Sequence, residues 1–129
     1  MSISWMVGKA QTVLGPVDGE ALGVTLPHEH LLMDGAALYA PPAASSDKGN
    51  SLKPVDWDIL SWLRYHPFEN VDNLRLLDEE LATREVLCFK AAGGRTVVDQ
   101  GNNGLGRDVN ALARIARVTG LHIIMGSGY

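Results

Sequence analysis

The sequence predicts an α/β fold in which parallel strands alternate with helices. Two observations lead to this prediction: apolar runs of strand length end in polar residues, and segments with helical spacing separate these runs. Strands that alternate with helical segments of about 10–15 residues form βαβ units with right-handed crossovers. We therefore expect one parallel sheet covered by helices.

The amino-terminal half predicts a hairpin, a first strand and a long connection. Residues 3–14 alternate loosely around Gly8-Lys9, which suits a short β-hairpin or two small strands. The run Val24 to Leu26 then predicts the first core strand, which leads into a pair of histidines. Residues 34–73 are rich in Ala, Pro, Ser, Gly and Asn. We expect this segment to be a functional or mobile connection with one helical turn near residues 57–63.

Two capped helices and two further strands are expected after this connection. Asp78 is a helix cap, and Gly93-Gly94 ends that helix. The predicted apolar face of this helix comprises Ala82, Val86 and Phe89. Residues 95–99 predict a buried strand, Asp108 caps the second helix, and residues 121–126 predict the third strand. The predicted apolar face of the second helix comprises Val109, Leu112, Ala113 and Ala116.

Composition is that of a globular domain without a nucleic-acid or membrane function. The 129 residues are 46% hydrophobic and 20% charged, and the net charge is −4. No stretch gathers the basic residues that nucleic-acid binding needs. No apolar run approaches the roughly 20 residues that span a bilayer, and the start lacks a signal-peptide core. We therefore expect a cytoplasmic protein.

The triplet His28-Glu29-His30 carries the main chemical signal. Side chains two residues apart on a strand point the same way, so both imidazoles can converge on one ion. Imidazole is a good ligand for zinc and similar metals, and active sites of parallel α/β folds lie at the carboxyl ends of strands. The alternative is two exposed or hydrogen-bonded histidines. We interpret His66, His122 and the single cysteine, Cys88, as packing or structural residues.

Motifs along nearly the whole chain resemble those of the phosphotriesterase family within the amidohydrolase superfamily. The similarity begins with GKAQTVLGPVD and LGVTLPHEHLL, at residues 8–18 and 22–32. It continues with DEELA, FKAAGGRTVVD, GLGRDV and TGL, at residues 78–82, 89–99, 104–109 and 119–121. The resemblance therefore concerns the chain as a whole rather than one motif.

This resemblance implies a TIM (β/α)8 barrel that carries two divalent metals at its carboxyl face. His28 and His30 would bind the more buried metal, and groups from strands four to eight would supply the other ligands. A hydroxide bridging the metals would attack a phosphoryl or carbonyl centre of a small-molecule substrate, because two nearby cations lower the pKa of water. The implied catabolic activity is hydrolysis of phosphotriesters (aryldialkylphosphatase activity), lactones, esters or amides. Zinc is the expected metal, although manganese, cobalt or iron also suit these ligands.

The resemblance also implies how the chain divides and which residues meet substrate. Residues 1–20 would form an amino-terminal hairpin, and residues 21–129 would form strands one to three of a partial barrel with their helices. Asp99 at the end of the second strand and Tyr129 near the site mouth are the expected substrate-binding residues. Plain hydrogen bonding at a strand end accounts for Asp99 equally well.

The sequence departs from the family because it ends at Tyr129, before the later metal ligands. Two histidines make a poor zinc site, since catalytic sites usually use three protein ligands. We therefore expect no appreciable hydrolase activity from the isolated chain and assign it no catalytic residue. A non-catalytic fragment that folds with a partner or as a homo-oligomer is an alternative, because sheet edges would be unpaired.

A second alternative is a phosphate- or nucleotide-binding module. Gly101, Gly104 and Gly106 form a glycine-rich turn between a strand and a helix, where helix amides can hold a phosphate. Their spacing is neither the dinucleotide fingerprint nor a phosphate loop, however. The sequence therefore favours the metal site over this alternative.

Overall fold

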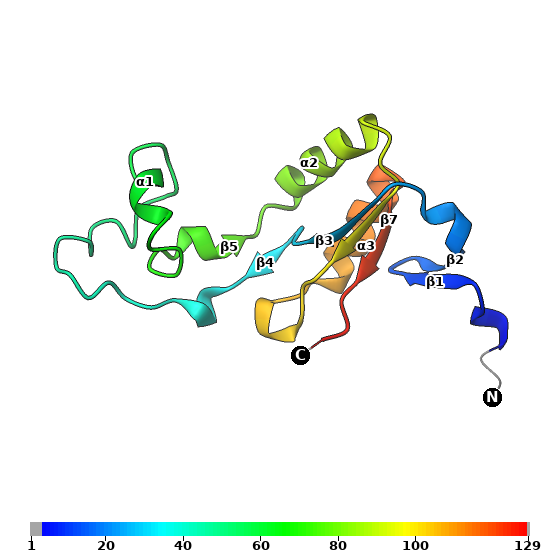
Figure 1. Cartoon of the computed structure of the whole chain (residues 1–129), viewed down its shortest axis with the longest axis horizontal. Coiled ribbons are helices and arrows are strands. Elements are labelled where there is room, and N and C mark those ends of the chain that lie inside the picture. The colour runs from blue at the N-terminus through cyan, green and yellow to red at the C-terminus, as the bar shows by residue number, and fades with distance from the viewer. Residues whose placement is uncertain (1–3, 129) are drawn as a thin grey trace.

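Three parallel strands form the centre of the structure, a computed structural model that describes residues 4–128 (Figure 1). In the order in which they pair, these strands are β3 (Thr25–Glu29), β6 (Thr96–Asp99) and β7 (His122–Met125). Helix α2 (Glu79–Ala91) precedes β6, and helix α3 (Val109–Thr119) connects β6 to β7. The predicted α/β fold with a parallel sheet is therefore confirmed.

The hydrophobic core lies where α2 and α3 cover this sheet. Val97 on β6 and Ile123 on β7 are both 0% exposed. The α3 residues buried against these strands are Ala111, Leu112, Ile115 and Ala116. The prediction that Val109 belongs to this face was wrong, since Val109 is 45% exposed. The predictions of Leu112 and Ala116 are confirmed, and Ala111 and Ile115 complete the packing face of α3.

Both predicted helix caps are present. One oxygen of Asp78 accepts a hydrogen bond from the Leu81 amide at 2.9 Å, and Asp108 accepts one from the Ala111 amide at 2.9 Å. Each carboxylate thus satisfies a free N–H in the first turn of its helix.

Cys88 is exposed on α2, so its interpretation as a packing residue was wrong. Within residues 4–128, no helix combines the length and apolarity needed to cross a membrane.

The amino-terminal hairpin consists of β1 (Lys9–Thr12) and β2 (Gly15–Asp18), which pair antiparallel. Its turn lies at residues 13–14 rather than at Gly8-Lys9, where we predicted it. The Thr12 hydroxyl donates to the Gly15 carbonyl at 2.6 Å and accepts from the residue 14 amide at 3.2 Å, which closes the turn. The Val13 amide donates to the Ile123 carbonyl at 2.9 Å and so ties the hairpin to β7.

Residues 35–74 form an arm that extends away from the sheet (Figure 1). A short antiparallel pair, β4 (Met33–Asp34) and β5 (Arg75–Leu76), closes the base of this arm, and α1 (Leu60–Leu63) lies within it. The buried Asn70 side chain donates to two backbone carbonyls of the arm, at 2.7 and 2.9 Å. Short 3-10 helices lie at Ser4–Met6, Gly19–Leu22, Ala36–Leu38, Asp72–Leu74 and Asn103–Leu105.

An ion pair between the two long helices makes the fold sensitive to acid. Arg114 on α3 donates to both carboxylate oxygens of Glu79 on α2, the shortest contact being 2.7 Å. This hydrogen bonding lowers the pKa of Glu79 below its ordinary value of 4.5. The unfolded chain therefore binds more protons than the folded chain as pH falls through that range, and stability is lost there.

We expect Glu79→Gln to reduce this acid sensitivity. The loss of melting temperature between about pH 7 and about pH 3 should be smaller in this variant than in the wild-type chain. Glu80→Gln is the matched control, because Glu80 lies 4.0 Å from Arg84 and its side chain is 92% exposed. Circular dichroism melts at the two pH values measure the effect, and equal losses in all three proteins would contradict it.

Candidate metal centre at the end of strand β3

The structure places the two predicted metal ligands side by side. His28 lies in β3, His30 follows directly after it, and their ring centroids are 5.8 Å apart in an edge-on arrangement. A zinc–nitrogen bond of about 2.0–2.1 Å puts each ring centroid about 3.2 Å from the ion, so two imidazoles on one ion are at most roughly 6.4 Å apart. The observed separation therefore suits one shared ion.

A β-bulge sets the direction of these imidazoles. Leu26 pairs with Val97 and Glu29 pairs with Asp99, so β3 has one residue more than β6 between the two pairs. This extra residue reverses the alternation, and as a result Leu26 and Glu29 face the same side of the sheet. Both line the cavity beneath α2. Because adjacent side chains on a strand point to opposite faces, His28, which directly precedes Glu29, points to the face of the sheet away from this cavity.

One atom of this pair is buried without a hydrogen bond. Among the described residues, His30 Nδ1 has no partner although it is shielded from solvent. A buried polar atom of this kind normally has a hydrogen-bond partner or a ligand. Within residues 4–128, however, no three His, Cys, Asp or Glu side chains come together to enclose a metal. The two imidazoles thus fit part of a metal's ligand set.

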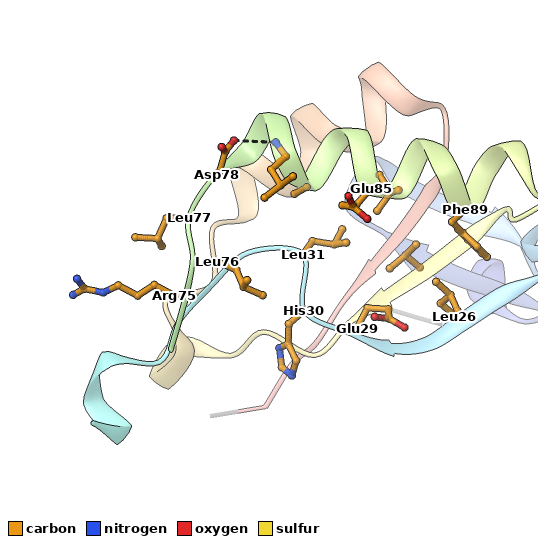
Figure 2. Close-up of a pocket in the computed structure, with 14 residues that line it drawn as sticks. Leu26, Glu29, His30, Leu31, Arg75, Leu76, Leu77, Asp78, Glu85 and Phe89 are labelled. Carbon is orange, nitrogen blue, oxygen red and sulfur yellow. Dashed lines mark hydrogen bonds between the residues drawn. The ribbon is translucent and has the colours of Figure 1, made fainter. Parts of the chain in front are cut away.

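A cavity of about 410 Å³ lies between β3 and α2 (Figure 2). Figure 2 shows the Glu29 side chain toward this cavity, and His30 also lines the cavity although its ring points away from α2. Arg75 lies at one end and forms an ion pair with Asp34 at 3.2 Å. The Ala36 amide and the Arg75 guanidinium lower the pKa of Asp34, which keeps this carboxylate charged.

Of the two predicted substrate-binding residues, the structure describes Asp99 but not Tyr129. Asp99 is 1% exposed, and both of its carboxylate oxygens accept hydrogen bonds from backbone amides. Its contact with substrate stays a prediction. Tyr129 lies outside the described residues. The other histidines lie on other elements: the His66 ring stacks on that of Trp62 in the arm, with centroids 4.8 Å apart, and His122 begins β7 at its amino end.

The glycine-rich turn has a structural explanation that does not favour the nucleotide-site alternative. The carboxylate of Asp108 occupies the first turn of α3, where a phosphate would otherwise bind. Gly106 adopts a left-handed conformation (φ 68°) that caps the short 3-10 helix. Arg107 donates to the Gly126 carbonyl and to Asn103 Oδ1, and so ties this turn to the end of β7.

Comparison with known proteins identifies the family. The sequence model of the phosphotriesterase family matches residues 8–129, which is nearly the whole chain. The chain belongs to the phosphotriesterase family.

The relatives within the phosphotriesterase family are longer than this chain. The N-acetyltaurine hydrolase of Tetraodon nigroviridis is 45% identical over 128 residues, which cover 98% of this chain and 36% of that protein. A resiniferatoxin-binding protein from Rhodobacter sphaeroides superposes with a TM-score of 0.90 at 43% identity, covering 95% of this chain and 34% of that structure. The organophosphorus hydrolase from Deinococcus radiodurans superposes with a TM-score of 0.56 at 30% identity, covering 92% of this chain and 28% of that structure.

Proposed function

We propose that this chain forms the first three strands of a (β/α)8 barrel in a metal-dependent hydrolase. The order β3-β6-β7, with a helix before each later strand, is what the start of such a barrel requires. Active sites of these barrels lie at the carboxyl ends of the strands. The histidine pair at the end of β3 supports the proposal, because it is placed at that end with both rings within reach of one ion.

His28 and His30 would hold one divalent metal, and zinc is the metal we propose for them. When bound, such an ion lowers the pKa of water and polarises the bond under attack. The chain's own contribution is to orient the two imidazoles at the end of β3 and to keep His30 partly shielded from solvent. The remaining ligands would come from strands beyond β7, as they do in the family.

An acyl amide is the substrate class that we propose first. The Tetraodon nigroviridis relative at 45% identity is an N-acetyltaurine hydrolase, whose name describes cleavage of an acetyl amide. The Deinococcus radiodurans neighbour at 30% identity is an organophosphorus hydrolase, which supports phosphotriester hydrolysis as the second candidate. Both reactions require the same chemistry, in which a polarised water attacks an electrophilic centre.

A chimaeric enzyme tests this proposal. The chain replaces the matching 128 residues of the Tetraodon nigroviridis N-acetyltaurine hydrolase, so that the host supplies the rest of the barrel. We expect hydrolysis of N-acetyltaurine that is lost on treatment with a chelator and restored by zinc. A folded chimaera that turns over neither N-acetyltaurine nor a phosphotriester after zinc loading would contradict the proposed function.

A further inference from the structure

The carboxylate of Asp99 lies behind the histidine pair, on the helix side of the sheet. Asp99 is two residues after Val97, whose side chain belongs to the core beneath the helices, so the two side chains share a face. The β-bulge directs His28 to the opposite face. A buried carboxylate in this place has no direct access to an ion bound between the imidazoles.

The contacts of Asp99 instead hold the backbone on one side of His30. Asp99 Oδ2 accepts a hydrogen bond at 2.8 Å from the amide of Leu31, the residue directly after His30. On the other side, the carbonyl of Glu29 accepts one at 2.7 Å from the amide of Gln100. The peptide units that flank His30 are therefore both fixed to the end of β6.

Two glycines allow these contacts to form. Asp99 Oδ1 accepts from the Gly101 amide at 2.8 Å, and a Cβ at this glycine would lie only 2.6 Å from that oxygen. The Gly126 amide donates to the Asp99 carbonyl at 2.7 Å, and a Cβ there would meet this carbonyl at 3.1 Å. Asp99 thus joins the ends of β3, β6 and β7 at one point.

We infer that Asp99 is a positioning residue for metal binding, which acts by fixing the direction of the His30 imidazole. The inference rests on the proposed function, because it takes His28 and His30 as the metal ligands. Hydrogen bonds from amides to a charged carboxylate are stronger than those between neutral groups, so they can hold a backbone segment in place. Groups that orient metal ligands typically change metal affinity by about 10–100-fold when they are replaced.

Calorimetric titration of the chain with zinc tests this role. In Asp99→Asn the amide keeps one acceptor oxygen but turns its NH₂ group toward a backbone N–H, so one of the two hydrogen bonds is lost. We expect its apparent Kd for zinc to rise at least about tenfold, at a temperature where circular dichroism shows the variant to be folded. His28→Asn and His30→Asn, which remove the proposed ligands, are measured beside it.

Asp108→Ala is the matched control. It also removes a carboxylate that accepts a backbone N–H, but Asp108 lies at the start of α3 rather than behind His30. This variant should melt at a lower temperature and keep its zinc affinity within about twofold. If Asp99→Asn does not fold, Asp99→Glu tests the same geometry, since it keeps the charge and displaces the carboxylate by one methylene, and a several-fold loss of affinity is expected.

The possible outcomes separate this inference from the proposed function. Unchanged zinc affinity in a folded Asp99 variant would overturn the positioning role alone, provided that the histidine variants lose affinity. Equal losses in Asp99→Asn and Asp108→Ala would overturn it too, because they would reflect general destabilisation. Unchanged affinity in the histidine variants would overturn both the metal site and the role of Asp99.

Discussion

Replacing His28 or His30 with asparagine in the chimaeric hydrolase is expected to lower kcat/KM for N-acetyltaurine by at least about 100-fold. Replacing a group that only orients a metal ligand costs about 10–100-fold in affinity or activity, and a direct ligand should cost more. Asparagine keeps a polar side chain of similar size but does not supply an imidazole nitrogen. Steady-state kinetics after removal of loosely bound metal measure the loss.

Rescue by metal distinguishes a lost ligand from a lost fold. Excess zinc should restore part of the activity of each histidine variant, because the remaining ligands still bind the ion weakly. His122→Asn is the matched control, since His122 is half-buried at the amino end of β7. Its kcat/KM should stay within about twofold of the unmodified chimaera. Activity within threefold of normal in a zinc-depleted His30 variant would refute the ligand assignment.

Ile123→Ala is expected to destabilise the chain by about 2–5 kcal/mol, the cost typical of truncating a buried isoleucine. Ile123 is 0% exposed on β7 and packs in one cluster with Val97, Leu112 and Ile115. The truncation removes apolar contacts on both sides of the sheet–helix interface and leaves a cavity that the parallel strands cannot easily close. Urea denaturation followed by circular dichroism measures the change.

Val118→Ala is the matched control for this truncation. Val118 lies on α3 but is 72% exposed, so it contributes little to the core. Its replacement should change the free energy of unfolding by no more than about 0.5 kcal/mol. Comparable losses in the two variants would show that the core does not lie between β7 and α3 as described.

The features that could be predicted from the sequence depend on residues close together in the chain. Asp78 and Asp108 each precede a helical repeat and cap the helix within the next three residues. The pairing of His28 with His30 also follows from their spacing of two on a strand. These signals are local, so the sequence contains them whatever the remainder of the fold does.

The direction of the histidine pair could not be predicted in the same way. Simple alternation would put Leu26 and His28 on one face, whereas the bulge in β3 separates them. This bulge arises from pairing with β6, about seventy residues later in the chain. The role of Asp99 has a similar origin, because its partner Leu31 is 68 residues away.

Other features were missed because their signals are short or conflicting. The β4 and β5 strands have two residues each, too few for a period of two to be recognised. On α3, Val109 fits an apolar period near the helix start, yet it is exposed because Ala111 and Ile115 face the sheet. The packing partner, rather than helical spacing alone, decides which apolar residues are buried.

The most direct test of a shared ion is a zinc titration of the chain followed by the ring signals of its four histidines in NMR spectra. We expect the signals of His28 and His30 to shift together with the same midpoint, while those of His66 and His122 stay in place. Separate midpoints for His28 and His30, or equal shifts at all four histidines, would contradict a single ion held at the end of β3.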